Sequence, residues 1–171
     1  MRRTFLLSLF AVLCVLKGST AEKFVSFQSG DLDITHPTVY VDGRDEKGVS
    51  IAARNLLLDF ERATGTAATM TSKDDATILV GTIGHNQAID RLVKQHLIDG
   101  EALQGKTEEF VITVVGSQLI IAGSDRRGTI YGIYELSKQI GVSPWYWWAD
   151  VPTVKRSKIF ALKGTYTDGK P

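Results

Sequence analysis

Two segments of this sequence carry residues that could bind a ligand or a partner, and the first is strongly aromatic. All three tryptophans fall within residues 145–148, inside the run Pro144–Pro152. Aromatic rings bury about 150–250 Å² each, so a cluster of them in a loop is unfavourable in water. The run therefore predicts either packing against a protein surface or stacking on the faces of sugar rings. Asp150, in the same run, is interpreted as a loop tether or as a hydrogen-bonding group for a ligand.

The second segment, Gly123–Leu136, leads from the end of a predicted strand into a predicted helix. Ser124 or Asp125 suits the N-cap position, because a short polar side chain there accepts the first unpaired backbone N–H groups. Gly128 and Gly132 lie four residues apart and therefore on one face of the helix. Glycine costs about 1 kcal/mol relative to alanine in a helix, so this face predicts a close packing contact. The contact is either with the domain's own sheet or with a neighbouring domain.

The remaining residues that could bind a metal or a phosphate are scattered along the sequence. His36, His85 and His96 are each solitary, and no metal-ligand spacing is present, so we expect no metal site. The pattern predicts His96 on the apolar side of a helix, as a core or boundary residue. Gly81–Gly84 lies between a strand and a helix, where a phosphate could bind, but it lacks the glycine pattern of nucleotide-binding loops. We interpret it as a tight turn, expect no cofactor and assign no catalytic residue.

The N-terminus has the three parts of a secretory signal peptide. Met1–Arg3 is short and basic, residues 4–16 are apolar, and residues 17–21 are small and polar, with Ser19 and Ala21 placed as in a cleavage site. The apolar run is too short for a membrane span, which needs about 20 residues. We therefore expect cleavage after Ala21, a secreted, extracellular product and no membrane association afterwards. An uncleaved membrane anchor is the alternative.

Length and composition limit what the mature chain can be. The 171 residues carry a formal charge of +1, and loss of Arg2, Arg3 and Lys17 with the signal changes it to −2. That charge gives no sign of a nucleic-acid partner. The single cysteine, Cys14, leaves with the signal, so neither a disulfide nor a thiol nucleophile remains. The chain has room for one domain but not for a complete (β/α)8 barrel, which needs about 250 residues.

Hydrophobic periodicity predicts one α/β domain over residues 22–165, a layered domain with about three helices flanking a mixed β-sheet. Apolar residues at helical spacing predict helices over 48–64, 86–97 and 126–140. Short apolar or alternating runs predict strands over residues 24–27, 38–41, 77–80, 110–115, 118–122 and 159–162. Gly116-Ser117 predicts the hairpin. Polar loops are expected over residues 28–33, 66–76 and 164–171.

The run from Gly123 to Pro152, GSDRRGTIYGIYELSKQIGVSPWYWWADVP, closely resembles the N-terminal domain of glycoside hydrolase family 115, whose members include xylan α-1,2-glucuronidases. Residues 22–122 agree with that domain more weakly, in the order of their elements. The layout is also similar to the α/β domain that precedes the barrel in families 20 and 67. The resemblance implies that the chain is truncated before a catalytic (β/α)8 barrel, and that residues 166–171 begin the linker to it.

The resemblance also implies roles for the two segments. The parent would be an inverting glycosidase acting on glucuronoxylan-type polysaccharide, and its catalytic carboxylates would belong to the barrel, so this chain alone is expected to be inactive. If the segments face the barrel mouth, an arginine would hold a uronate carboxylate and a tryptophan would stack on a pyranose. The substrate-binding residues would then be Asp125, Arg126, Arg127, Trp145, Trp148 and Asp150. The competing role is packing against the barrel through Gly128, Tyr131, Gly132 and Trp147.

Two other functions stay open at this point. The chain could be a self-standing secreted carbohydrate-binding or interaction module, in which the tryptophan run recognises a polysaccharide directly. The parent could instead resemble a family 20 hexosaminidase, although the Trp-Tyr-Trp-Trp-Ala-Asp run disfavours that assignment.

Overall fold

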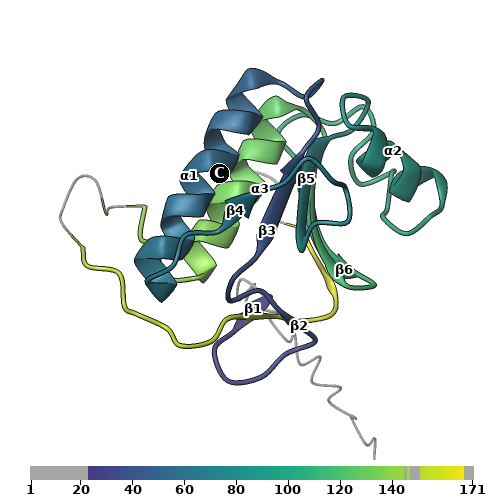
Figure 1. The fold of residues 1–171 in the computed structure, drawn as a ribbon. Helices are drawn as coiled ribbons and strands as arrows, with labels where there is room; N and C mark the ends of the chain where they lie inside the picture. The colour runs from purple at the N-terminus through teal and green to yellow at the C-terminus, as the bar shows by residue number, and fades with distance from the viewer. Residues whose placement is uncertain (1–22, 145, 147–150, 168–171) are drawn as a thin grey trace, which may run out of the picture.

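The computed structural model describes residues 23–144, 146 and 151–167, and the expected signal segment 1–21 lies outside them. Within the described ranges the helices are α1 (Lys47–Thr64), α2 (Gln87–Lys94) and α3 (Arg126–Gln139). The strands are β1 (Val25–Ser26), β2 (Leu32–Asp33), β3 (Thr38–Val41), β4 (Thr69–Met70), β5 (Ile78–Thr82), β6 (Phe110–Val115), β7 (Gln118–Gly123), β8 (Phe160–Ala161) and β9 (Thr165–Tyr166). Figure 1 shows the arrangement of these elements.

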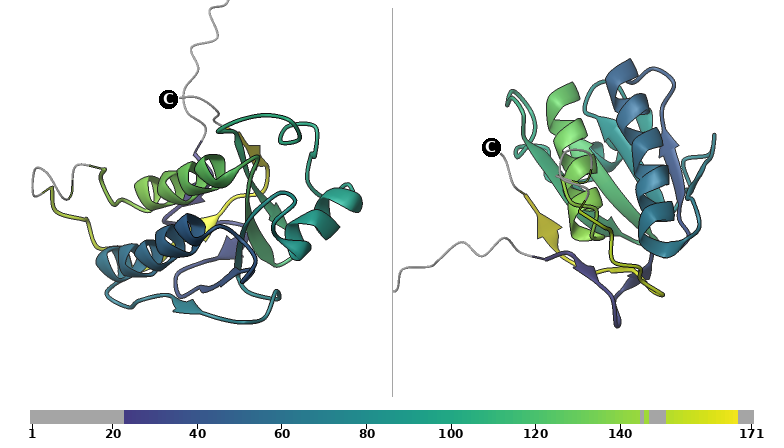
Figure 2. Two further views of the ribbon diagram at one scale, coloured as in Figure 1. Left: turned by 90° about the horizontal axis from the view of Figure 1, so that it is seen from above. Right: turned by 90° about the vertical axis from the view of Figure 1, so that its left-hand side faces the viewer.

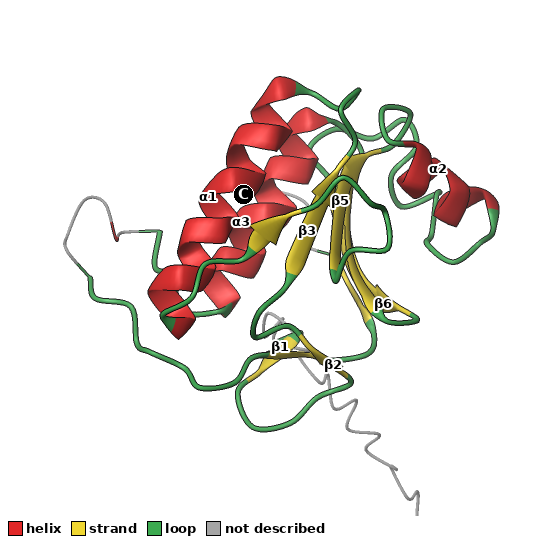
Figure 3. Ribbon diagram, viewed as in Figure 1, coloured by secondary structure: helices red, strands yellow, loops and turns green. Residues whose placement is uncertain are grey.

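The strands form one large mixed sheet and one small antiparallel sheet (Figure 3). The large sheet has the order β4-β3-β5-β7-β6-β9. Its first four strands are parallel, whereas β6 pairs antiparallel with both β7 and β9. The β6–β7 hairpin turns at Gly116, which has a positive φ of 59°. The small sheet has the order β1-β8-β2. The prediction of an α/β domain with a mixed sheet is therefore confirmed.

Helices cover both faces of the large sheet (Figure 2), because its central strands are apolar on both sides. Successive side chains of a strand point to opposite faces. Ile78 of β5 and Ile121 of β7 belong to the core beneath α1 and α3, whereas Leu79 and Ile120 belong to the core beneath α2. This burial on both faces is typical of parallel strands and explains their continuous apolar runs.

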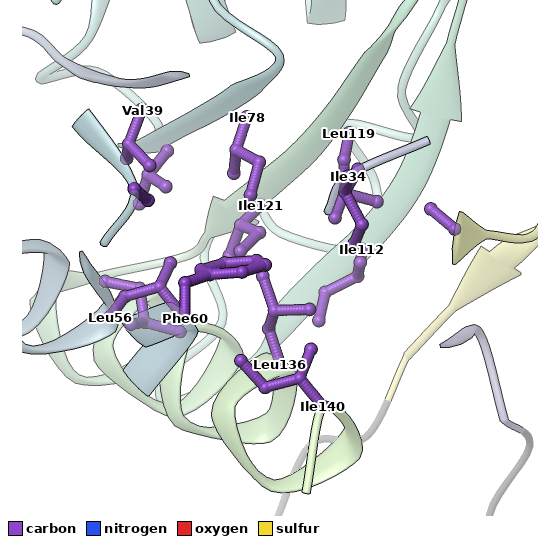
Figure 4. Close-up of a cluster of buried hydrophobic side chains, with 14 of the residues drawn as sticks. Ile34, Val39, Leu56, Phe60, Ile78, Ile112, Leu119, Ile121, Leu136 and Ile140 are labelled. Atoms are coloured by element: carbon purple, nitrogen blue, oxygen red, sulfur yellow. The ribbon is translucent and has the colours of Figure 1, made fainter. Parts of the chain in front are cut away.

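The larger core lies between the sheet and the α1–α3 pair. Phe60 of α1 and Leu136 of α3 pack toward Ile121 of the sheet (Figure 4), and all three side chains are fully buried. Helix α1 ends at Gly65, whose φ of +90° lets its N–H donate to the carbonyl of Glu61. The predicted helix over 48–64 and its glycine cap are thus confirmed.

Two short strands occupy segments for which polar loops were expected. Strand β2 lies within residues 28–33 and pairs with β8, and strand β4 lies within residues 66–76 and pairs with β3. Each has two residues, so neither can show the alternation by which a strand is recognised in a sequence. Their pairing depends on strands distant in the chain.

The second helix is shorter than the predicted range 86–97. It ends at Lys94, and His96 adopts a left-handed φ of +55° in the turn that follows. The N–H of Leu97 donates to the carbonyl of Leu92, which closes this turn in the manner of a Schellman cap. The prediction that His96 lies on the apolar side of the helix was wrong: it is exposed, because the helix ends before reaching it.

The last strand places the end of the domain later than the sequence indicated. Tyr166, assigned to the linker 166–171, pairs in β9 with Ile112 of β6 and is buried. Its ring lies 5.1 Å from that of Phe24, and its hydroxyl donates to Glu135. Tyr166 is therefore part of the domain, and the boundary after residue 165 was wrong. Residues 168–171 lie outside the described residues.

Candidate functional site

The turn that begins α3 uses Asp125 as its N-cap. Asp125 Oδ1 accepts the N–H of Gly128 at 2.8 Å, and Oδ2 accepts the N–H of Glu108 at 3.0 Å. Ser124 Oγ in turn accepts the N–H of Glu109 at 3.0 Å. The carboxylate of Asp125 therefore caps one helix and ties it to the segment before β6. This geometry gives Asp125 a structural role, one of the two N-cap assignments that the sequence allowed.

The two arginines of this turn are both exposed, but they differ in their partners. Arg127 forms an ion pair with Glu108, with 2.7 Å between Nη1 and Oε1, and donates to the hydroxyl of Tyr131. The hydrogen bond to Tyr131 and the nearby Glu108 raise the pKa of Arg127 above its usual value. The aliphatic part of Arg126 lies against Gly48 of α1. Arg127 thus already holds a carboxylate, whereas Arg126 has no ion pair within the described part of the chain.

The glycine face of α3 packs on the domain's own sheet. A Cβ atom on Gly128 would lie 2.1 Å from the carbonyl oxygen of Glu109, and one on Gly132 would lie 2.8 Å from Ile121 Cγ2. Tyr131 is half-buried and packs against the same core. The assignment of Gly128 and Gly132 to packing between domains is therefore corrected: their small size permits close contact with β6 and β7, and both residues are buried.

The carboxyl ends of the parallel strands are the place where α/β sheets commonly bind ligands, where neighbouring strands lead to opposite faces. Here β3 leads to α1 and β5 leads to α2. Asp42 directly follows β3, at this edge of the sheet. Asp42 Oδ2 accepts the N–H of Gln87 at 3.1 Å and a hydrogen bond from Arg44 at 2.8 Å. The Arg44 guanidinium holds the pKa of Asp42 well below its usual range. A carboxylate of the protein thus occupies the N-terminus of α2.

A second carboxylate closes the same edge of the sheet. The buried Asp45 accepts the N–H of Thr82 at 2.8 Å through Oδ2 and the N–H of Glu46 at 2.8 Å through Oδ1. Asn86 caps α2 by accepting the N–H groups of Ala88 and Ile89. The segment Gly81–Gly84 is therefore a strand-to-helix turn whose donors bond to the protein itself. Sequence reasoning missed Asp42 and Asp45, because their partners lie about 40 residues away.

A pocket of about 290 Å³ opens between α1 and α3, on the side of these helices away from the sheet. Six of its lining residues matter here: Asn55, Leu58, Asp59, Tyr134, Ser137 and Pro144. Asn55 donates to the hydroxyl of Tyr134 at 3.3 Å. Ser137 Oγ is buried and has no hydrogen-bond partner among the described residues.

The base of the predicted aromatic run lies beside this pocket. Tyr146 packs against the large core, and the guanidinium of Arg62 lies 4.8 Å from the centre of its ring. Arg62 also forms an ion pair with the buried Asp59, with 2.6 Å between Nη1 and Oδ1. The other predicted site residues of the run, Trp145, Trp147, Trp148 and Asp150, lie outside the described residues. Of residues 145–150, the structure therefore describes only Tyr146, which lies at the opposite end of α3 from Asp125.

The described residues contain neither a metal-binding cluster nor a membrane-spanning helix. No group of three or more histidine, cysteine or carboxylate side chains there is arranged to hold a metal ion. None of the helices in those ranges combines the length and the apolar character that a bilayer crossing requires.

Comparison with known proteins gives one informative relative. No family model matches the sequence, and no curated protein matches it. Among solved structures, the chain is similar to BtGH115A, described as a family GH115 4-O-methyl-alpha-glucuronidase with specificity for decorated arabinogalactans. The TM-score is 0.68 and the identity 33%, over 85% of this chain and 18% of that enzyme.

Two more distant structures share the fold alone. The N-acetyl-beta-hexosaminidase of Streptomyces plicatus has a TM-score of 0.53 and 16% identity, over 85% of this chain and 24% of that one. CpGH84D has a TM-score of 0.50 and 16% identity, over 68% of this chain and 19% of that one. This chain thus spans less than a quarter of each of these three proteins. At 33% identity over 85% of its length, the chain is similar in structure to the N-terminal region of a family GH115 glucuronidase.

Proposed function

We propose that this chain is the non-catalytic N-terminal domain of a secreted glycoside hydrolase of the GH115 type, and that it packs on and supports the catalytic barrel. The observation that carries the proposal is the match to the GH115 enzyme over 85% of this chain but only 18% of that enzyme. The proposal carries over to this chain the role of the region that it resembles, which is an argument by analogy. Residues 1–21, with their signal-peptide pattern, would direct the product out of the cell.

The chemistry of the described carboxylates supports a role without catalysis. Asp42, Asp45 and Asp125 each accept at least two backbone N–H groups, which hold the side chain in place. A general acid needs a raised pKa and access to the scissile bond. These three carboxylates instead accept hydrogen bonds from backbone N–H groups at helix N-termini and turns. We therefore expect the isolated chain to release no sugar.

The parent enzyme would remove uronic acid from a decorated plant polysaccharide. An inverting mechanism would place an acid and a base on opposite sides of the bond, with room for water between them. Both would belong to the barrel. Glucuronoxylan and decorated arabinogalactan carry the same kind of substituent, so the substrate class is stated at that level, and the assay distinguishes the two polymers.

The direct test is a chimera, because covalent linkage keeps the two parts together. The matched N-terminal region of the GH115 enzyme would be replaced by residues 22–171 of this chain. We expect the chimera to release 4-O-methylglucuronic acid and to unfold at a higher temperature than the enzyme lacking that region. The isolated chain should release none from either polymer. Release by the isolated chain, or a chimera no more stable or active than the shortened enzyme, would contradict the proposal.

A self-standing carbohydrate-binding module is the second candidate, and the pocket beside Tyr134 is the observation that favours it. An aromatic ring next to the polar side chains of Asn55 and Asp59 suits a sugar. Affinity electrophoresis in gels containing glucuronoxylan separates the two candidates. Retardation of the isolated chain that Tyr134→Ala abolishes would establish the module, and unaltered migration would exclude binding through this pocket.

A further inference from the structure

A second pocket lies where the last turn of α3 meets β1 and the segment that precedes β8. Its volume is about 390 Å³, within the range of ligand sites, which measure about 300–1,000 Å³. We call it the basic pocket, because three of the lining residues that matter here are cations and one is a carboxylate. These residues are Lys23, Val25, Phe27, Glu135, Lys138 and Arg156.

Within the described residues, the one carboxylate that lines the basic pocket already has partners. Glu135 Oε2 forms an ion pair with Lys138 Nζ at 3.0 Å. Glu135 Oε1 accepts hydrogen bonds from Nε2 of Gln139 at 3.0 Å and from the hydroxyl of Tyr166 at 3.2 Å. One carboxylate against three cations leaves an excess of two positive charges. The basic pocket is therefore positive although the chain without residues 1–21 has a formal charge of −2.

The end of α3 also faces the basic pocket, and the last carbonyl groups of a helix carry partial negative charge. Here the carbonyls of residues 136–138 accept the N–H groups of residues 140–142. Because these carbonyls are already hydrogen-bonded, they oppose an anion less than free helix-end carbonyls would.

Arg156 is the cation of the basic pocket that lacks a partner. Its guanidinium lies 4.1 Å from the centre of the Phe27 ring, and the residue is half-buried. Its Nε is buried without a hydrogen-bond partner among the described residues, and the ion pairs found there do not include it. By contrast, Lys155 and Lys158 of the same segment each donate to an oxygen of the protein, at 3.0 and 3.1 Å. Burying part of a charged group without a partner is unfavourable, and an anion in the pocket would supply that partner.

The lining of the basic pocket favours a carboxylate attached to a carbon skeleton. A guanidinium presents parallel N–H donors that match a carboxylate, and Lys23 and Lys138 add positive charge at the rim, where both are exposed. Val25 and Phe27 line the same pocket and offer apolar contact that an inorganic anion cannot use. A sugar acid has both parts, a carboxylate and a ring with C–H groups that can lie against apolar side chains.

We propose that the basic pocket is a non-catalytic binding site for the carboxylate of a sugar acid, with Arg156 as the main contact. That the pocket binds an organic acid is independent of the proposed function. That the acid is a uronate of the decorated polysaccharide rests on the proposed function, which supplies the substrate. The site would hold a substituent of the polymer beside the enzyme without taking part in cleavage.

Isothermal titration calorimetry of residues 22–171 tests the site with glucuronate, glucose and inorganic phosphate as probes. We expect glucuronate to bind, and glucose and phosphate to bind at least tenfold more weakly. Binding of glucuronate should also weaken as salt is added, because salt screens charges near the surface. Absence of glucuronate binding, or equal binding of glucose, would overturn the site. Phosphate that binds as tightly as glucuronate would overturn the assignment to a sugar acid.

Three substitutions test which residues hold the carboxylate. Arg156→Gln should weaken glucuronate binding at least tenfold, whereas Lys106→Gln, at an exposed lysine outside the pocket, should leave it unchanged. Because Arg156 packs on Phe27, its loss can also disturb the fold. Lys138→Gln avoids this difficulty, since the side chain is 53% exposed, and it should weaken binding about threefold. A Lys138→Gln variant that binds glucuronate as tightly as the wild type would contradict the proposal.

The chimera described above separates this inference from the proposed function. An active, stabilised chimera built from a chain that does not bind glucuronate would overturn the site and leave the proposed function intact. An inactive chimera built from a chain that does bind glucuronate would overturn the proposed function, and with it the polysaccharide as the source of the acid, but would support the pocket as a sugar-acid site.

Discussion

The close contact between α3 and the sheet allows a quantitative test through Gly128→Ala. The new Cβ would lie 2.1 Å from the carbonyl oxygen of Glu109. That oxygen accepts the N–H of Ser124 at 2.9 Å, so it cannot move aside without breaking a backbone hydrogen bond. Overpacking costs about 1–3 kcal/mol, and a backbone obstacle places this substitution near the upper end. Alanine regains up to about 1 kcal/mol of helix propensity. We therefore expect a net loss of about 2 kcal/mol.

Gly48→Ala is the matched control, because it also lies near the start of a helix. Its Cβ would lie 3.3 Å from Arg126 Cδ and 3.4 Å from Ile130 Cδ1, both of which belong to side chains that can shift. The propensity gain should then dominate, and stability should be unchanged or rise by up to about 1 kcal/mol. Gly132→Ala, which meets the side chain of Ile121, should fall between the two.

Urea unfolding followed by circular dichroism measures all three variants of the chain begun at Glu22. A loss of about 2 kcal/mol corresponds to a fall of about 4–8 °C in Tm for a domain of this size. If Gly128→Ala proves as stable as the wild type, or if Gly48→Ala loses as much as Gly128→Ala, the reasoning fails. The glycines of α3 would then not be required by contact with the sheet.

Three further predictions concern single side chains. Asp42→Asn should flatten the acid limb of the stability curve: the lowered pKa stabilises the fold above the unfolded value of about 3.9, and this contribution disappears as pH falls toward the native pKa. Urea titrations at pH 7, 4 and 2.5 measure it, and an unaltered acid limb would argue against the Arg44 pair. Asp125→Ala should cost about 1–2 kcal/mol of unfolding free energy, because the cap of α3 is lost; a smaller loss in the same titration would reduce the cap to a minor contact. Tyr166→Ala should cost about 3 kcal/mol, as expected for a buried aromatic ring, with the exposed Tyr134→Ala as control, and equal effects would return residue 166 to the linker.

Much of the fold could be predicted because the longer elements have strong local patterns. The helix over 48–64 shows apolar residues at helical spacing and a terminal glycine, and the structure has it at Lys47–Thr64. The hairpin at Gly116-Ser117 and the helix after Asp125 were equally clear. The two-residue strands β2, β4 and β9 were not, because they lie in polar segments and are defined by their partners; β1 and β8 are as short but lie within the apolar runs 24–27 and 159–162.

The candidate site was only partly predictable, for a similar reason. Asp125 was recognised as an N-cap from its place before a helix, a local signal. Asp42 and Asp45 were missed, because each accepts a backbone N–H from an element about 40 residues away. Ser137 and the pocket were missed as well. In the sequence, Ser137 is an ordinary polar residue within a helix, and only the packing of α1 beside α3 buries its hydroxyl away from any hydrogen-bond partner among the described residues.

The sequence by itself determined the class of domain and indicated its resemblance to family GH115, because periodicity and a long specific run are local properties of the chain. Only the tertiary structure decided what the distinctive residues contact. Gly128 and Gly132 were compatible with a neighbouring domain or with the domain's own sheet, and contacts with Glu109 and Ile121 decided for the sheet. The exposure of Ile51, Leu58 and Tyr134 was decided in the same way, since the burial of a helix residue depends on which side of the helix the sheet occupies.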